Sequence, residues 1–343
     1  MNFYINNSCT DPYFNLALEQ FIFDFSGPAS FNEHSDKLNR GYNYFMLWRN
    51  SNSVIVGKNQ NTIAEIDSIF VKSNNINVVR RLSGGGAVYH DLGNLNFTFI
   101  TDADKKNTID FSSFCKLIQK ALFSFGVSAE ISGRNDLTVE GKKVSGNAQY
   151  IKKGRVMHHG TLLYDCDLDM LSGALNVKDD KLQSKGIKSV RSRVANIRPF
   201  MKEDMPVEVF SAELKNFLFS EFNMSEYLLS KDEINKIEKL KEDVYSKRSW
   251  NYGSSVPYNI RKKRRIEGCG NIEILIDVGK EGIIDNIAFF GDFFGNDDPA
   301  MLAEMLKGHH FEYGELAQVI KDINLMNFFH DITEALFLSL LFE

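Results

Sequence analysis

The chain has 343 residues, 43% of them hydrophobic and 12% aromatic, so it can build a large core and is longer than one typical domain. Its 40 basic and 45 acidic side chains leave a formal charge of −5, which argues against a protein that mainly coats nucleic acid or an anionic membrane. The four cysteines lack Cys-x-x-Cys spacing, which favours reduced thiols over a disulfide framework or a zinc cage.

The first predicted element is a helix. Asp11 followed by Pro12 is typical of an N-cap and the first helical position, and the apolar residues after them recur at helical spacing. The preceding residues form neither a basic leader nor an apolar signal segment, and no stretch reaches the ~20 apolar residues of a membrane span, so we expect a cytoplasmic protein. Residues 26–42 predict a polar loop, residues 44–48 a strand, and residues 53–57 a strand that pairs back as a hairpin.

A glycine-rich turn is the most informative segment. Residues 80–91 read Arg-Arg-Leu-Ser-Gly-Gly-Gly-Ala-Val-Tyr-His-Asp, and the apolar alternation at 95–99 predicts a half-buried strand after them. Glycines let backbone N–H groups approach an anion, and the arginines supply charge and paired donors. A Walker loop or a dinucleotide-binding turn would run into a helix with other glycine spacing. The turn therefore predicts a local phosphate cradle, with a plain tight turn as the alternative.

The next elements alternate between helices and a hairpin. Glu140 and Gly141 predict the turn of a hairpin formed by residues 137–139 and 143–145. The other elements predicted up to residue 245 are helices at 114–125, 167–175, 207–222 and 231–245 and a strand at 157–164.

A change in composition at residues 249–253 predicts a domain boundary, giving domains 1–248 and 249–343. Residues 270–278 and 282–290 predict a hairpin, and helical patterns at 299–306, 313–320 and 328–342 complete a small α+β module. The five consecutive cations at 261–265 predict a solvated turn or a patch that docks an acidic protein, because no aromatic residues are interleaved for nucleic acid.

Three motifs in this order resemble the lipoate–protein ligase family, namely the glycine turn, Lys-Val-Ser-Gly at 143–146 and His-His-Gly-Thr at 158–161. The resemblance covers roughly the first two hundred residues, and the combination is far more specific than any single motif. Further matching segments lie at 12–17, 47–50, 57–61, 132–136 and 189–194.

The resemblance implies an α+β fold, with a large mixed-sheet catalytic domain of the biotin/lipoate ligase type and a smaller C-terminal domain. It implies a ligase that uses ATP and Mg²⁺ to convert lipoate into lipoyl-AMP and pyrophosphate, and then transfers the lipoyl group to a lysine. The implied acceptors are lipoyl domains of 2-oxo acid dehydrogenase E2 subunits or the glycine-cleavage H protein. We expect a monomer that binds neither nucleic acid nor a membrane.

The resemblance also assigns roles to single residues. Lys143 would be catalytic, with its ammonium against the acyl carboxylate and the α-phosphate, while Lys142 would be a solvated hairpin lysine. His158 would be a structural residue of the core or of the surface, and the basic loop at 176–193 would close over the adenylate. The implied ATP-binding residues are Arg81, Gly86, Ala87, Val88 and Tyr89, with Lys143. The implied lipoate or adenylate contacts are Arg80, Ser83, Gly85, Asn135, Asp136 and His159, again with Lys143, and Asp136 would be a Mg²⁺ ligand.

Two alternatives stay open. An octanoyl or lipoyl acyltransferase would transfer the acyl group without adenylation, through a cysteine nucleophile. Cys166 is the cysteine nearest a motif, but its acidic neighbours Asp165 and Asp167 would raise its pKa, so we expect it to be structural. The second alternative is a catalytically silent protein that binds lipoyl domains, and the presence of Lys143 argues against it. Biotin ligation is disfavoured because the Arg-rich Gly-Arg-Gly-Arg turn typical of biotin ligases is missing from the glycine turn.

Overall fold

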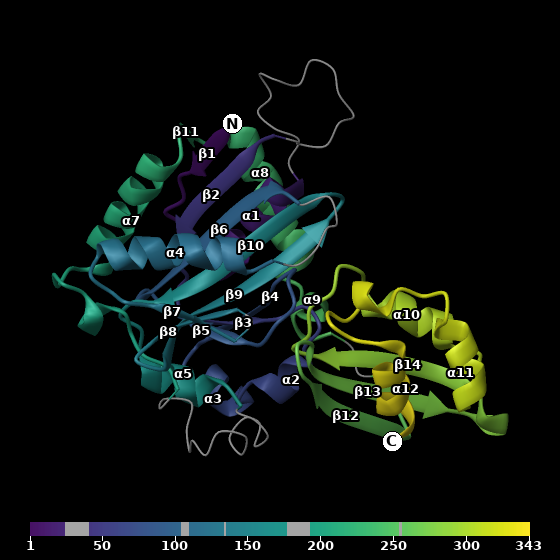
Figure 1. The fold of residues 1–343 in the computed structure, drawn as a ribbon. Helices are drawn as coiled ribbons and strands as arrows, with labels where there is room; N and C mark the ends of the chain where they lie inside the picture. The colour runs from purple at the N-terminus through teal and green to yellow at the C-terminus, as the bar shows by residue number, and fades with distance from the viewer. Residues whose placement is uncertain (25–40, 104–109, 134, 177–192, 254–255) are drawn as a thin grey trace. The chain divides into compact units, whose positions relative to one another are not determined.

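The computed structural model describes residues 1–24, 41–103, 110–133, 135–176, 193–253 and 256–343. These residues form two compact units (Figure 1). The N-terminal unit comprises residues 1–56, 63–80 and 88–251, and the C-terminal unit comprises residues 57–62, 81–87 and 252–343. The domain boundary between residues 248 and 249 stays a prediction, since compact units are defined by contacts and not by independent folding. The predicted loop at 26–42 lies almost entirely outside the described residues.

An eight-stranded mixed sheet, counted over the described residues, forms the frame of the N-terminal unit. Its strand order is β11-β1-β2-β6-β10-β9-β8-β7. β1 pairs in parallel with both of its neighbours, whereas the pairs from β2 through β7 are antiparallel. The mixed sheet with helices confirms the predicted α+β class. The strands are β1 (Asn2–Ile5), β2 (Asn43–Trp48), β6 (Asn94–Asp102), β7 (Glu130–Ser132), β8 (Asp136–Val139), β9 (Lys142–Lys152), β10 (Arg155–Leu163) and β11 (Met224–Tyr227).

Helices cover both faces of this sheet (Figure 1). α1 begins as predicted, because Asp11 Oδ1 accepts a hydrogen bond from the backbone N–H of Tyr13 at 2.9 Å. The predicted helices at 114–125, 167–175, 207–222 and 231–245 are all confirmed within a few residues. The helices of this unit are α1 (Pro12–Asp24), α2 (Thr62–Glu65), α3 (Ser68–Ser73), α4 (Ser112–Ser124), α5 (Leu168–Ala174), α7 (Val207–Glu221), α8 (Lys231–Leu240), the π-turn η3 (Lys241–Tyr245) and α9 (Arg248–Tyr252), with a 3₁₀ turn η2 (Arg198–Phe200).

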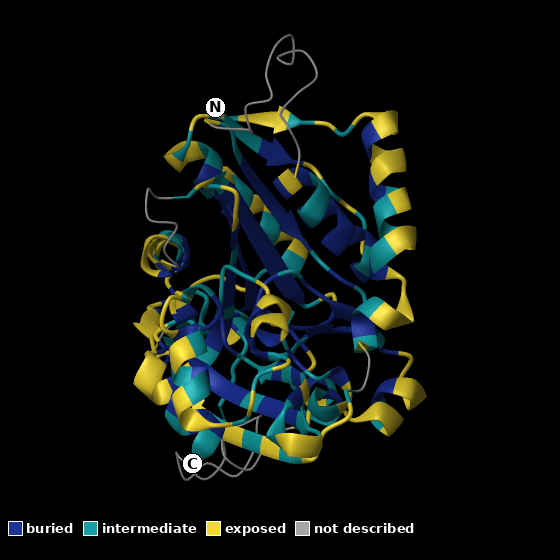
Figure 2. Ribbon diagram, turned by 90° about the vertical axis from the view of Figure 1, so that its right-hand side faces the viewer, coloured by how far each residue is buried: buried dark blue, intermediate teal, exposed yellow. Residues whose placement is uncertain are grey.

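β6 is more deeply buried than its alternating sequence predicts. Its polar residues Asn94, Asn96 and Thr98 are as buried as its apolar ones, because α1 and α4 leave neither face of this central strand to solvent (Figure 2). Hydrogen bonds compensate for the burial, for example from Asn94 Nδ2 to Asn96 Oδ1 at 2.7 Å. The prediction of a half-buried strand was therefore wrong about one face.

β3 (Ser53–Val56) does not form the predicted hairpin with β2. It is the centre of a separate three-stranded sheet, parallel to β4 (Asn77–Arg80) and antiparallel to β5 (Val88–His90). All four residues of β3 are buried, which requires a neighbour on each edge and cover on each face. The strands that supply both edges are the ones that flank the glycine turn, so this small sheet carries the turn at its end.

The C-terminal unit packs helices on one face of an antiparallel sheet of order β12-β13-β14. The hairpin of β13 (Gly270–Val278) and β14 (Ile284–Gly291) is confirmed. Residues 261–265 lie in β12 (Ile260–Ile266), so the predicted solvated turn was wrong. The helical elements are η4 (Lys280–Gly282), α10 (Pro299–Leu306), α11 (Tyr313–Ile320), η5 (Leu325–Asn327) and α12 (Glu334–Phe342).

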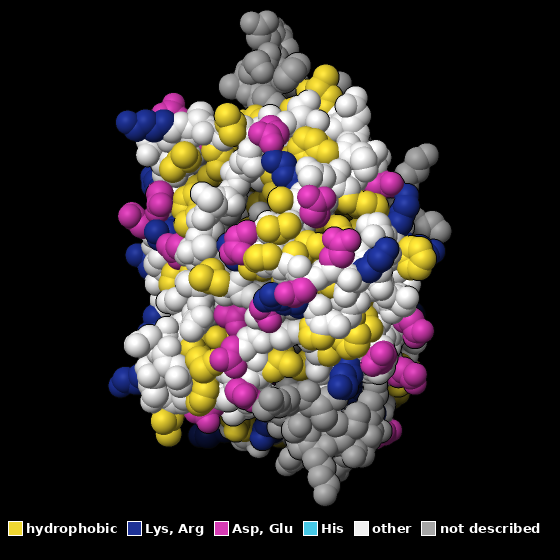
Figure 3. Space-filling model, turned by 90° about the vertical axis from the view of Figure 1, so that its left-hand side faces the viewer, with side chains coloured by type: hydrophobic (Ala, Val, Ile, Leu, Met, Phe, Trp, Pro, Cys, Tyr) yellow, Lys and Arg dark blue, Asp and Glu magenta, His cyan; other side chains and the backbone are white. Residues whose placement is uncertain are grey.

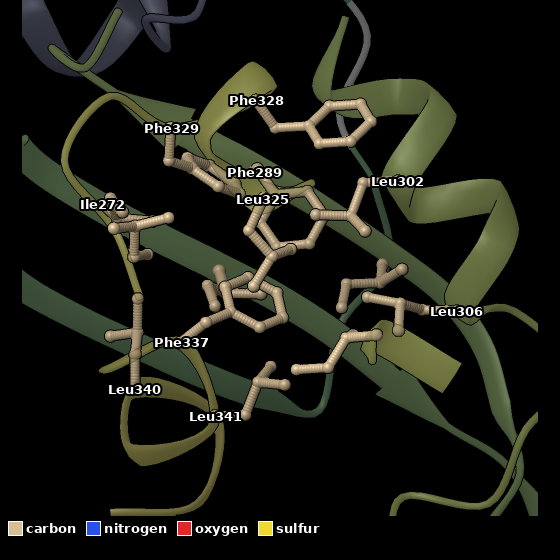
Figure 4. Packing of buried hydrophobic residues seen from close by; sticks show 14 of the residues in the cluster. Ile272, Phe289, Leu302, Leu306, Leu325, Phe328, Phe329, Phe337, Leu340 and Leu341 are labelled. Carbon is tan, nitrogen blue, oxygen red and sulfur yellow. The ribbon is translucent and has the colours of Figure 1, made fainter. Parts of the chain in front are cut away.

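The core of this unit is aromatic. The rings of Phe289, Phe329 and Phe337 meet under α10, whose Leu302 and Leu306 point toward them (Figure 4). α12 begins later than the predicted residue 328, because Thr333 caps it by accepting a hydrogen bond from the N–H of Leu336. No helix in the described parts of the chain has the length and apolar character needed to cross a membrane. On the surface drawn in Figure 3 cations and anions are interspersed, as the small net charge implies.

Candidate active site

The glycine turn is built around the side chain of Arg81. Its Nε donates to Ser83 Oγ at 3.0 Å, and its Nη2 donates to the carbonyl oxygens of Gly84 at 2.6 Å and Gly86 at 2.8 Å. Arg81 and Ser83 are only 6% and 1% exposed. The guanidinium therefore fixes the shape of the turn by binding its carbonyls, and the half-exposed part of the turn is Gly86 to Val88.

Two glycines are required by close backbone approaches. A Cβ on Gly57 would lie 2.0 Å from the carbonyl oxygen of Gly85, and a Cβ on Gly84 would lie 2.3 Å from that of Phe293. Gly85 also has a φ of 88°, which disfavours other residues. By contrast, a Cβ on Gly86 would meet no heavy atom of the described residues within 4 Å. The buried glycines thus pack the turn within the C-terminal unit, and Gly86 leaves open space.

Arg80 holds a different part of the chain. Its Nε donates to the carbonyl oxygen of Trp250 at 2.9 Å and its Nη2 to that of Asn251 at 3.2 Å. The indole N–H of Trp250 donates back to the carbonyl oxygen of Arg80 at 2.9 Å. Burial lowers the pKa of Arg80 to about 10. These contacts give Arg80 a structural task in joining β4 to α9.

A β-bulge determines where Lys143 points. Along the β8–β9 pair, Leu137 faces Ser145 but the next residue, Thr138, faces Lys143, so Val144 is an extra residue of β9. Directly opposite residues in an antiparallel pair point to the same face. Without the bulge, Lys143 would share the face of the buried Leu137. The extra residue moves Lys143 to the face of Asp136 and Thr138, as bulges near active sites often do.

The ammonium of Lys143 lies partly exposed at the surface, beside a carboxylate. Its Nζ is 2.7 Å from Asp136 Oδ1, and the two side chains are 36% and 34% exposed. A Cβ on Gly146 would lie only 2.8 Å from this Nζ, so glycine makes the position possible. The backbone of Lys143 is pinned as well, because its N–H donates to the carbonyl oxygen of Arg193 and its carbonyl oxygen accepts from Ala195, at 2.8 and 2.9 Å.

Of the predicted basic loop at 176–193, residues 177–192 lie outside the described residues. Asn135 is part of the same hairpin. Its side chain donates to the carbonyl oxygen of Asn147, and its own carbonyl oxygen accepts from the backbone N–H of Asn147 at 2.9 Å. Lys143, Asp136, Asn135 and Gly146 are thus brought together, whereas Arg81, Ser83 and Gly84 to Gly86 form their own group.

The two histidines of β10 face opposite sides of the sheet. His158 is fully buried and stacks on Phe114 with ring centroids 4.4 Å apart, accepting from Gln149 at Nδ1 and donating to Asn147 Oδ1 from Nε2. Burial, with a smaller effect of neighbouring His159, holds the pKa of His158 well below its ordinary value. His159 instead donates from Nδ1 to Glu19 Oε1 at 2.9 Å. His158 is a core residue, as expected.

Sequence reasoning missed the buried polar network around Glu19. This carboxylate, 2% exposed, accepts from His159 and from Thr98 Oγ1 at 2.6 Å, and Thr98 accepts from the indole of Trp48. A second buried amide, Asn15, donates to Asn50 Oδ1. Asn15 and Glu19 are four residues apart and therefore share one side of α1. The sequence signal that could have revealed this network is the pair of polar residues at this spacing in an otherwise apolar helix.

Two other motif residues, Tyr89 and Asp91, are buried. Tyr89 is 1% exposed, and burial raises its pKa above the ordinary value. Asp91 accepts from the backbone N–H groups of Gly93 and Asn94 through Oδ1. None of the four cysteines, all of which the structure describes, forms a disulfide. Burial, with the Asp91 carboxylate, raises the pKa of the Cys166 thiol well above its ordinary value. Within the described ranges no three His, Cys, Asp or Glu side chains gather in a way that could hold a metal ion.

The chain matches two protein-family models. The model described as "Lipoyl protein ligase A/B catalytic domain" matches residues 11–219, and "Bacterial lipoate protein ligase C-terminus" matches residues 255–341. Lipoate-protein ligase LplJ of Bacillus subtilis (strain 168) is 42% identical over 345 residues, spanning 100% of both chains. Lipoate–protein ligase 1 of Staphylococcus aureus is 43% identical over 332 residues, spanning 97% of each.

Solved structures show the same fold. P. falciparum LipL1 in complex with lipoate superposes with a TM-score of 0.79 at 24% identity, covering 99% of this chain and 97% of that one. A bipartite lipoate protein ligase of Thermoplasma acidophilum, described with its E2 lipoyl domain, gives a TM-score of 0.59 at 29% identity, with 76% and 99% covered. A lipoate-protein ligase A bound with ATP gives 0.58 at 26% identity, with 74% and 99% covered. With both family models matched and relatives similar over the whole length, the chain belongs to the lipoate–protein ligase family and is an enzyme of that type.

Proposed function

We propose that this enzyme adenylates lipoate with ATP and then transfers the lipoyl group to a lysine of an acceptor protein. The observation that carries the proposal is the bulged hairpin, which holds the ammonium of Lys143 at a partly exposed position beside one carboxylate. The relatives named as bound to ATP and to lipoate support these two substrates. The relative described with its E2 lipoyl domain supports a lipoyl domain as acceptor.

In the first step an oxygen of the lipoate carboxylate attacks the α-phosphorus of ATP, and the bond to pyrophosphate breaks. Two anions approach each other in this step, so a cation at the reacting atoms lowers the barrier by neutralising both. We assign this task to Lys143. Its flexible stem can follow the charge from the carboxylate to the phosphate, and its half-exposed ion pair with Asp136 can be exchanged for a substrate anion.

For the glycine turn we propose nucleotide binding. The accessible residues Gly86, Ala87 and Val88 would contact ATP, and the open space at Gly86 would admit it. Arg81 and Tyr89 would act mainly by fixing the turn and the strand behind it. Arg80, Ser83 and Gly85 would contact the lipoate or the adenylate, as would His159, whose ring Glu19 holds in place.

In the second step the amine of the acceptor lysine attacks the acyl carbon of lipoyl-AMP. AMP leaves with the electron pair of the anhydride bond, and the amine loses a proton to solvent. The proposed acceptors are lipoyl domains of 2-oxo acid dehydrogenase E2 subunits or the glycine-cleavage H protein. A monomeric enzyme remains our prediction.

A resident Mg²⁺ site does not fit the residues. Asp136 Oδ1 is within 2.7 Å of the Lys143 ammonium, and a second cation there would be repelled. We propose that Mg²⁺ enters with the ATP phosphates and keeps several waters. Asp136 as a direct Mg²⁺ ligand stays an untested prediction, and the ion pair with Lys143 disfavours it.

The alternative of an acyltransferase needs a reactive thiol. The raised pKa and burial of Cys166 disfavour a thiolate there, so no specific observation supports this alternative.

The decisive experiment follows pyrophosphate release from ATP and lipoate in the absence of an acceptor. Lys143→Ala should reduce the rate by about 10²–10³-fold, as expected when one transition-state charge contact is lost. Lys142→Ala, at the exposed neighbouring position, is the matched control and should retain the wild-type rate. Wild-type enzyme that releases no pyrophosphate would contradict the proposed adenylation.

A further inference from the structure

The ion pair between Asp136 and Lys143 depends on two unusual features of the same hairpin. The bulge at Val144 turns Lys143 to the face of Asp136, and glycine at position 146 leaves room for the ammonium opposite Asp136. An exposed pair of this kind adds only about 0–1 kcal/mol to stability. Stability alone therefore does not explain why the hairpin is built to form it.

From this construction we infer that Asp136 is a positioning residue for Lys143. It holds the Lys143 ammonium in one position while the site is empty. When substrate binds, the substrate anion replaces the Asp136 carboxylate as the partner of the ammonium. A lysine has four rotatable carbon bonds, and a fixed partner reduces the number of positions its ammonium samples before reaction. Since both side chains are about one third exposed, exchange of the carboxylate for a substrate anion costs little desolvation. This inference rests on the proposed role of Lys143.

Asp136→Asn should lower kcat for pyrophosphate release by about tenfold while KM for lipoate changes less than twofold, because positioning acts on the chemical step. Asp136→Glu, which keeps the charge, should recover most of the rate. Glu226→Gln is the matched control, since it removes the exposed pair of Lys215 with Glu226 on the same sheet and should change neither constant.

Three outcomes would overturn the inference. A large rise in the Mg²⁺ concentration needed for half-maximal rate in Asp136→Asn would make Asp136 a metal ligand, and an unchanged kcat would leave the pair without a role. The NMR signal of the Lys143 NH₃⁺ group, identified by its loss in Lys143→Met, should shift in Asp136→Asn but not in Glu226→Gln. An unshifted signal would also overturn the inference, and this measurement does not depend on the enzyme being a ligase.

An independent observation concerns β12. It is an edge strand of its sheet among the described residues, and its exposed positions are the cations Arg261, Lys263 and Arg265. Arg261 pairs with Glu273 at 2.6 Å, whereas Lys263 and Arg265 form no ion pair with any residue that the structure describes. The five consecutive cations at 261–265 give this strand a strong positive charge in a chain whose net charge is −5.

We propose that the edge of β12 docks an acidic face of the acyl-acceptor domain. An edge strand offers unpaired backbone groups to which another strand can add, and the exposed cations would select an acidic partner and speed its approach. Nucleic acid is disfavoured, because this strand offers no aromatic ring for a base to stack on. This second proposal also rests on the proposed ligase function.

The test compares Lys263→Glu/Arg265→Glu with the control Lys236→Glu/Lys239→Glu on the exposed side of α8. With an unlipoylated lipoyl domain as acceptor, the β12 variant should raise the acceptor KM about tenfold and flatten its salt dependence. Pyrophosphate release without an acceptor should be unchanged in both variants. Binding of the same lipoyl domain, measured at low and high salt, gives a readout that does not depend on turnover. Equal KM and equal binding in the two variants would overturn the proposal.

Discussion

Arg81 in the glycine turn and Lys143 in the β8–β9 hairpin are both cations in family motifs, and the protein holds them in opposite ways. Arg81 is 6% exposed and donates to one hydroxyl and two carbonyl oxygens of its own turn. Lys143 is 36% exposed at its side chain and has one carboxylate beside it. The contrast indicates that the arginine charge maintains backbone shape, whereas the lysine charge is available for exchange with a ligand. The following predictions probe that difference.

The largest effect on stability is expected for Arg81→Ala. The change leaves Ser83 Oγ and the carbonyl oxygens of Gly84 and Gly86 without their donor, and should lower the free energy of unfolding by about 3 kcal/mol. Urea unfolding monitored by fluorescence would measure it. Arg81→Lys keeps the charge but not the forked donors, so it should recover less than half of the loss. Full recovery by lysine would show that charge, and not geometry, matters in the turn.

A pair of glycine substitutions tests the packing of the same turn. Gly57→Ala should destabilise the protein by about 2 kcal/mol, since its Cβ would lie 2.0 Å from a backbone oxygen that cannot move freely. Gly86→Ala should cost less than about 0.5 kcal/mol, because its Cβ would enter open space. Thermal unfolding gives both values. Equal unfolding temperatures for the two variants would contradict the assignment of close packing to Gly57 and of open space to Gly86.

In the hairpin the corresponding change should affect activity more than stability. The Cβ of Gly146→Ala would lie 2.8 Å from Lys143 Nζ, which is the flexible end of a side chain and can move away. We expect a loss of stability below about 1 kcal/mol and a fall in pyrophosphate release of about tenfold, through displacement of the ammonium. Gly314→Ala, at a helical position with open space, should leave the rate unchanged. A normal rate in Gly146→Ala would remove the link between this glycine and Lys143.

A pH dependence of stability is expected from His158, which like Arg81 has its hydrogen-bond partners inside the protein. Its pKa is held well below the ordinary value in the folded protein, so the unfolded chain binds more protons below pH 6.5. The free energy of unfolding should therefore fall as pH is lowered from 6.5 to 5, by an amount on the order of 1 kcal/mol. In His158→Gln this slope should be reduced, as measured by denaturation at each pH. An identical slope would place the titrating group elsewhere.

Local patterns predicted most of the helices and strands, because capping residues and apolar periodicity act within a few residues. The N-cap at Asp11 and the turn at Glu140 and Gly141, which have φ values of 51° and 75°, are of this kind. The failures were long-range. The partners of β3 lie at residues 77–80 and 88–90, and no feature of the strand itself distinguishes them from β2.

The motifs select candidate site residues, and the structure adds how those residues are arranged. Motifs picked out Lys143 and the glycine turn, and the structure adds that Arg81, which the resemblance assigns to the nucleotide, donates to two carbonyl oxygens of its own turn. The bulge could not be foreseen, because Val144 looks like any apolar strand residue. Glu19 was overlooked for a similar reason, since its partners Thr98 and His159 are distant in sequence.

The single additional residue in β9 also has an evolutionary consequence. A deletion within this short segment would preserve the lysine, the serine and the glycine as letters, and an alignment would score it as a minor gap. In three dimensions it would rotate the amino group by half a turn of the strand, from water into the hydrocarbon interior beside Leu137. The number of residues in this segment, and not only their identity, therefore decides which face of the sheet carries the amino group.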